Sequence, residues 1–81
     1  MQSIEKQILH LVDVGGQVSA RTLVQIYTQR HYSEMTIRNN LSALKNDGQI
    51  TNIRRGWYAI TAAGRQHLAD ITQKYLHYHA V

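Results

Sequence analysis

The chain has 81 residues, of which 43% are hydrophobic, and a formal net charge of +4. This length and hydrophobic fraction predict one small folded domain over residues 1–81 and exclude a disordered chain. The absence of cysteine excludes disulfides and thiolate metal sites. We find no apolar run of membrane-spanning length and no signal-peptide pattern, so we expect a cytoplasmic protein with no membrane contact. The positive charge favours an anionic partner but also suits plain solubility.

The first part of the chain predicts two helices separated by one short strand. Hydrophobic residues recur at helical spacing over residues 4–14 and again over about 20–30. Ser3 and Ser19 precede these stretches, where a hydroxyl can cap the first turn. A glycine pair ends the first helix, and residues 17–19 are long enough for a single strand.

The third predicted helix occupies residues 33–46 and has two different sides. Ile37, Leu41 and Leu44 fall at positions i, i+4 and i+7, which predicts a buried stripe. Ser33 can cap the first turn. The opposite side is polar and basic, and its residues are Met35, Arg38, Asn39, Ser42 and Asn46, with Thr36 and Lys45 at its flanks. Within this set, Met35 could contact a thymine methyl group or pack against the second helix, and we favour packing.

From residue 50 the helical spacing gives way to alternation. Residues 50–53 and 57–61 are rich in β-branched and aromatic side chains and predict a hairpin whose turn contains two arginines and a glycine. Alternation assigns Tyr58 and Ile60 to the core with Ile50. Trp57 is then expected on the outer face, in contact with a residue across the hairpin, either Ile53 or Thr51.

A last helix is predicted over about residues 62–79, with Thr61 as its cap. The fold class is therefore mainly α with a small β-hairpin, in the order helix, strand, helix, helix, strand, strand, helix. This is the winged helix-turn-helix arrangement, in which the third helix enters the major groove of DNA and the hairpin, or wing, reaches alongside.

Three motifs resemble those of bacterial winged helix-turn-helix transcriptional regulators. The run MTIRNNLSALKNDGQI resembles the recognition-helix region of DeoR-like repressors. The run WYAITAAGRQHL resembles the exit from the wing in MarR-like regulators, and Val18-Ser19-Ala20-Arg21-x-Leu23 resembles the entry to their second helix. The resemblance implies a regulator of transcription that binds duplex DNA as a homodimer. Asn39 and Asn40 replace the second arginine and the aspartate of the DeoR pattern, so its base preference does not carry over.

The candidate DNA-binding residues lie on the third helix and in the turn of the hairpin. Arginine and asparagine can bond two base-edge atoms at once, whereas serine and lysine more often hold phosphates. We expect base contacts from Thr36, Arg38 and Asn39, phosphate contacts from Ser33, Ser42 and Lys45, and backbone or minor-groove contacts from Arg54 and Arg55.

The remaining candidate features concern assembly and chemistry. The last helix has an apolar stripe of Leu68, Ile71, Tyr75, Leu76 and Tyr78. We expect this stripe to pair two subunits in a homodimer, with Leu68, Ile71, Tyr75 and Tyr78 at the interface; the alternative is that it folds back on the first helix. The five histidines have no partner at ligand spacing, so neither a metal nor another cofactor is expected. The absence of paired reactive groups argues against an enzyme. Two alternatives stay open: a winged-helix adaptor that binds protein, and an RNA-binding or replication-accessory module.

Overall fold

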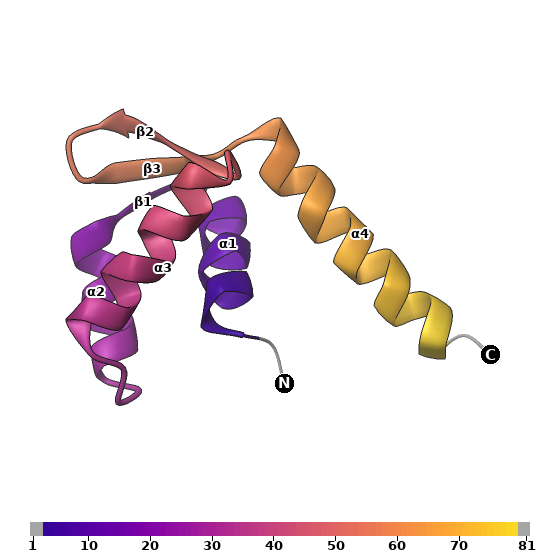
Figure 1. The fold of residues 1–81 in the computed structure, drawn as a ribbon, viewed down its shortest axis with the longest axis horizontal. Coiled ribbons are helices and arrows are strands. Elements are labelled where there is room, and N and C mark those ends of the chain that lie inside the picture. The colour runs from indigo at the N-terminus through magenta and orange to yellow at the C-terminus, as the bar shows by residue number, and fades with distance from the viewer. Residues whose placement is uncertain (1–2, 80–81) are drawn as a thin grey trace.

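A computed structural model describes the backbone of residues 3–79 and the side chains of residues 3–71. The elements follow the predicted order, which confirms the fold class (Figure 1). They are α1 (Ile4–Gly15), β1 (Gln17–Ser19), α2 (Ala20–Thr28), α3 (Glu34–Asn46), β2 (Ile50–Arg54), β3 (Trp57–Ile60) and α4 (Ala62–His79).

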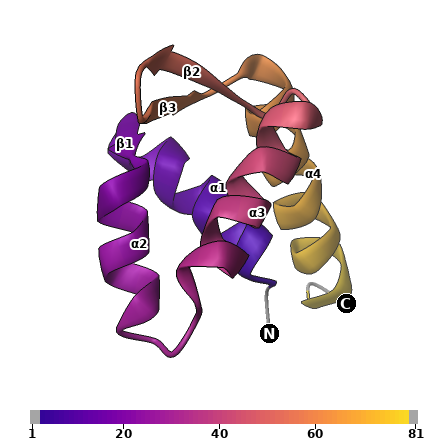
Figure 2. The ribbon, with the colours of Figure 1, turned by 60° about the vertical axis from the view of Figure 1, so that its left-hand side comes forward.

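The strands form one antiparallel sheet in the order β1-β3-β2, with β3 in the centre. Ile50 pairs with Ile60 and both are buried, so the predicted inner face of the hairpin is confirmed. The helices extend from this inner side, and no helix covers the opposite face of the sheet in either view (Figures 1 and 2).

The hydrophobic core lies between α1, α2, α3 and the inner face of the sheet. No charged or polar residue is buried among the described side chains. The apolar spacing predicted from the sequence therefore accounts for the packing. The largest fully buried side chains are Ile8, Leu9, Val12, Leu23, Ile37, Leu44 and Ile50.

Hydroxyl side chains begin all the helices, as predicted. In each case the hydroxyl oxygen accepts a hydrogen bond from the backbone N–H three residues later, which satisfies a donor that the helix itself leaves free. The caps are Ser3, Ser19, Ser33 and Thr61. The helix α2 stops at Thr28 rather than at about residue 30, because the backbone N–H groups of Arg30 and His31 bond to carbonyls three residues earlier instead of four.

The link between α2 and α3 is held by ring contacts. The rings of Tyr27 and Tyr32 meet edge to face with their centres 6.0 Å apart, and the guanidinium of Arg30 lies 5.5 Å from the centre of the Tyr27 ring. Burial raises the pKa of the Tyr27 hydroxyl, with the positive charge of Arg30 acting in the opposite direction. His31 adopts a left-handed φ of 71°, which turns the chain into α3.

The start of α4 is fastened to the loop between α3 and β2. The backbone N–H of Thr61 donates to the Gln49 carbonyl at 3.0 Å, and the Thr61 hydroxyl donates to the Gly48 carbonyl at 2.6 Å. Gly64 then approaches this loop so closely that a Cβ atom would clash with the Gln49 carbonyl oxygen and lie 2.7 Å from Ile60 Cγ1. The glycine in the WYAITAAGRQHL run is therefore explained by backbone packing.

Beyond this attachment, α4 extends away from the other helices (Figure 1). Leu68 is half-buried and packs against the core, and Arg65 Nε lies 3.6 Å from Asp13 Oδ1 of α1.

Within the described residues, none of the helices combines the length and the apolar character that a membrane span requires.

Candidate nucleic-acid interface

The outward face of α3 presents polar side chains that have no partner inside the domain. Asn39, Ser42 and Lys45 are exposed, and no hydrogen bond or ion pair involves their side chains within residues 3–71. The buried stripe on the other side of the helix fixes this face toward solvent. These three predicted DNA-binding side chains are therefore free to bind a ligand.

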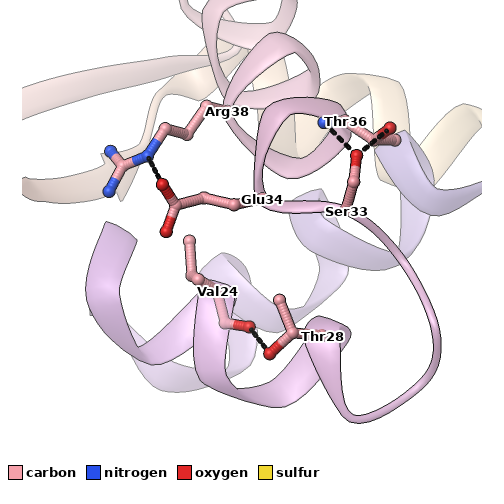
Figure 3. A network of polar contacts seen from close by, with 6 residues as sticks. All are labelled: Val24, Thr28, Ser33, Glu34, Thr36 and Arg38. Carbon is pink, nitrogen blue, oxygen red and sulfur yellow. Dashed lines mark hydrogen bonds and ion pairs between the residues drawn. The ribbon is translucent and has the colours of Figure 1, made fainter.

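Arg38 lies on the same helix but has a partner. Its Nε lies 3.4 Å from Oε2 of Glu34, one helical turn earlier, and both side chains are more than half exposed (Figure 3). An exposed pair of this kind contributes about 0–1 kcal/mol to stability. A phosphate or base can therefore displace Glu34 at small cost.

Ser33 and Thr36 are committed to starting the helix. The Ser33 hydroxyl oxygen accepts from the Thr36 backbone N–H at 3.1 Å, and the two hydroxyls share a further hydrogen bond of 2.9 Å. Figure 3 shows this pair on the opposite side of α3 from Arg38 and Glu34. The structure therefore does not place Thr36 beside Arg38, and the predicted DNA contacts of Ser33 and Thr36 stay predictions.

Met35 does not pack against α2, so the prediction for this residue is wrong. Its side chain is 72% exposed, on the outward face of α3. An apolar side chain in that position suits contact with a thymine methyl group.

The wing carries Arg54 and Arg55 at its tip, as predicted. Gly56 follows them with a left-handed φ of 75°, which closes the turn. The guanidinium of Arg54 stacks on the indole of Trp57, 4.5 Å from the ring centre. Trp57 thus makes the predicted cross-strand contact, but with a different partner. The reason is a bulge between Asn52 and Arg54, which shifts the register so that Arg54, rather than Ile53 or Thr51, lies opposite Trp57.

A residue that the sequence prediction missed, Arg21, lies beside the wing. The backbone N–H of Ala20 donates to the Gly56 carbonyl at 2.8 Å, which joins the start of α2 to the wing turn. Arg21 is the next residue and is exposed. The sequence offered one signal for Arg21, namely a basic residue directly after the Ser19 cap and Ala20. The sequence could not show that Arg21 lies near the wing, because that depends on a contact between distant parts of the chain.

Charge is distributed unevenly along the chain. We call residues 16–61, which contain α2, α3 and the sheet, the central segment. It holds six of the nine lysines and arginines and two of the five acidic residues, and therefore the whole net charge of +4. One of its two acids, Asp47, lies near Lys6 of α1 in a cavity away from the wing. Glu34 is the other. On α3 and the wing, four basic residues therefore outnumber this acidic residue; they are Arg38, Lys45, Arg54 and Arg55.

The described part of the chain offers no metal site. Within it, no three His, Asp or Glu side chains are grouped closely enough to hold an ion. His77 and His79 lie outside the residues whose side chains are described.

The predicted dimer interface finds no support. Leu68 packs against the core and Ile71 is half-buried, so neither requires a second subunit. Tyr75, Leu76 and Tyr78 lie outside the residues whose side chains are described.

The fold and its basic face define a small winged-helix domain. A comparison with protein families matches residues 3–58, from the cap of α1 into β3, to the family described as MCM5, C-terminal domain. The match covers more than half of the chain, and the chain belongs to this family. No curated protein and no solved structure was found to match it.

This membership corrects the resemblance to bacterial DeoR-like and MarR-like regulators, which was wrong. The motifs that carried the resemblance record packing: Ile37, Leu41 and Leu44 are core residues, and Gly64 permits a close backbone approach. Winged-helix domains of different families need the same packing, so these motifs do not distinguish one family from another.

Proposed function

We propose that this domain binds duplex DNA through α3 and the wing, as an accessory module in replication. The family name supports replication over transcription, because MCM5 is a component of a replicative helicase. The replication-accessory alternative therefore replaces the transcriptional repressor that the sequence motifs suggested.

The observation that carries the proposal is the concentration of positive charge on the central segment. Its basic residues are exposed, and no described charged residue is buried, so the core does not require this charge. Phosphate neutralisation by such residues supplies most of the sequence-independent affinity of proteins for DNA. Four of these basic residues, Arg38, Lys45, Arg54 and Arg55, lie on α3 and the wing, which are the two elements that a winged helix places against duplex DNA.

Two groups of side chains have distinct roles in the proposed complex. Asn39 and Arg38 project from α3, where an amide and a guanidinium can bond base edges in the major groove. Lys45 on α3, Arg21 on α2 and Arg55 in the wing hold phosphates on either side of the groove and fix the orientation of the domain.

The test is to measure the affinity for a fluorescently labelled duplex by anisotropy, across a range of salt concentrations. The double variant Arg38→Ala/Asn39→Ala is expected to lower the affinity roughly tenfold or more, since each well-made base contact contributes about 1–3 kcal/mol. The affinity of the wild-type domain is expected to fall steeply with salt, because bound phosphates release counterions.

The chain offers a matched control on α4. Arg65→Ala/Gln66→Ala also removes an adjacent arginine and amide, but at a distance from the wing, and is expected to leave the affinity unchanged. Equal affinities for the two double variants would contradict the role of α3. Absence of binding even at low salt would contradict DNA binding itself and favour the protein-adaptor alternative.

A further inference from the structure

The outer face of the sheet is an open surface next to the basic wing. The strand register assigns residues to this face, because paired residues in an antiparallel sheet point to the same side and the Ile50–Ile60 pair points inward. No acidic residue is among them, and no helix covers them (Figures 1 and 2). They are Gln17, Ser19, Thr51, Arg54, Trp57 and Ala59.

Trp57 and Arg54 form a preassembled stack on this face. The guanidinium carbon lies 4.5 Å from the centre of the indole ring. Trp57 is half-buried, and its backbone carbonyl accepts a hydrogen bond of 3.5 Å from the Asn52 side chain across the hairpin. This hydrogen bond joins the two strands at Trp57, and the bulge at Asn52 and Arg54 sets the guanidinium over the indole ring.

An indole ring and a planar guanidinium are groups on which unpaired bases stack. Bases inside a duplex are already stacked on their neighbours and cannot offer a ring face. Arg55 follows Arg54 directly, and Arg21 lies beside the wing turn, so phosphates that follow a stacked base meet positive charge.

We infer that the outer face of the sheet binds single-stranded DNA, with bases stacked at the Trp57–Arg54 pair. The inference rests on the proposed function in one respect: Arg54 belongs both to the wing that meets the duplex and to the stack. The preferred substrate is then a duplex with a single-stranded tail, held by α3 on the paired part and by the sheet on the unpaired part.

Trp57 is the one tryptophan of the chain, so its fluorescence reports directly on this face. Oligo(dT) is expected to quench the fluorescence of Trp57 on binding, because a stacked base contacts the ring. A blunt duplex is expected to quench it less. By anisotropy, a duplex with an oligo(dT) tail is expected to bind about tenfold more tightly than the blunt duplex, which corresponds to one stacked base.

The variant Arg54→Lys keeps the charge and removes the planar group. We expect it to abolish the preference for the tailed duplex, measured as the ratio of the two affinities. Arg55→Lys makes the same chemical change one residue away and is expected to shift both affinities together, with the ratio retained. The variant Trp57→Leu removes the indole ring and is a second test of the same ratio of affinities. Circular dichroism verifies that this variant folds. If Trp57→Leu does not fold, Arg54→Lys still tests the stacking site.

The outcomes separate this inference from the proposed function. Duplex binding with neither quenching by oligo(dT) nor a preference for the tail would overturn the stacking site and leave duplex binding intact. An unchanged ratio in Arg54→Lys would also overturn it, since the pair would then serve only to stiffen the hairpin. Quenching by oligo(dT) without any duplex binding would contradict the proposed function and support the stacking site.

Discussion

The central segment and the two helices that flank it in sequence use their charges differently. In the central segment, the positive charges exceed the negative ones by four, and Arg38 has an ion-pair partner while Arg21, Lys45 and Arg55 have none among the described side chains. In α1 and α4, three basic residues balance three acidic ones. Arg65 of α4 lies near Asp13 of α1, so charges there join one helix to the other.

This difference separates the half of the molecule whose charges balance one another from the half that we propose binds DNA. The core is apolar throughout the described residues, so it tolerates either charge distribution. The excess charge therefore does not stabilise the fold and is better explained by an anionic partner. If so, charge changes on the flanking helices should leave DNA affinity nearly unchanged, whereas charge changes on the basic face should act mainly on that affinity.

The largest effect is expected where α4 is attached. Gly64→Ala places a methyl group against the Gln49 carbonyl oxygen and the Ile60 side chain, so the first turn of α4 must move. We expect the free energy of unfolding to fall by roughly 2 kcal/mol, as for other overpacked sites. Urea unfolding followed by Trp57 fluorescence measures this loss. Ala63→Ser, at an exposed neighbouring position, should change it by less than about 0.5 kcal/mol. If Gly64→Ala also changes the free energy of unfolding by so little, the close approach of Gly64 to Gln49 does not constrain the residue at this position.

A charge reversal in the central segment and another on α4 test directly whether the position of the charge matters for DNA binding. Arg21→Glu should weaken duplex binding roughly tenfold at low salt and reduce the salt dependence by about one phosphate contact. Arg65→Glu changes the net charge by the same amount on α4 and should leave duplex affinity nearly unchanged. Anisotropy titrations at several salt concentrations give both values. If the two variants lose affinity equally, net charge rather than its position governs binding, and the distinction between the central segment and the flanking helices is wrong.

The smallest effect is expected from the acid on the basic face. Glu34→Gln removes a negative charge and releases Arg38, so the affinity for duplex DNA should rise about threefold. Glu34 also occupies the first turn of α3, where a negative charge favours the helix, so stability should fall by less than about 1 kcal/mol. Asp70→Asn on α4 is the matched control and should leave the affinity unchanged. A loss of affinity in Glu34→Gln would mean that Arg38 needs its partner to be held in position.

The sequence predicted the fold because the signals that determine it are local. Ser3, Ser19, Ser33 and Thr61 each cap the helix that follows, and a cap needs only a hydroxyl and the next three residues. The spacing of Ile37, Leu41 and Leu44 likewise determines which side of α3 is buried. The order of the elements followed from these signals.

The proposed binding surface was predicted only in part, since its geometry depends on contacts between distant residues. The position of Arg21 beside the wing follows from the hydrogen bond between Ala20 and Gly56, which are far apart in sequence. The Arg54–Trp57 stack follows from a bulge that alternation along a single strand does not reveal. Helical spacing placed Met35 on the outward face correctly, and the prediction was wrong because we gave more weight to the usual burial of an apolar side chain. The family was missed because core motifs are shared among winged helices.

The hydrogen bond between Ala20 and Gly56 also bears on the thermodynamics of association. It ties the tip of the wing to the start of α2, and together with the pairing of β1 with β3 it fastens the hairpin to the helix-turn-helix unit. Ordering a mobile loop on binding would cost about 1–2 kcal/mol of entropy for each residue fixed. In this domain that ordering is completed when the chain folds. Complex formation should therefore carry only a small conformational entropy penalty on the protein side.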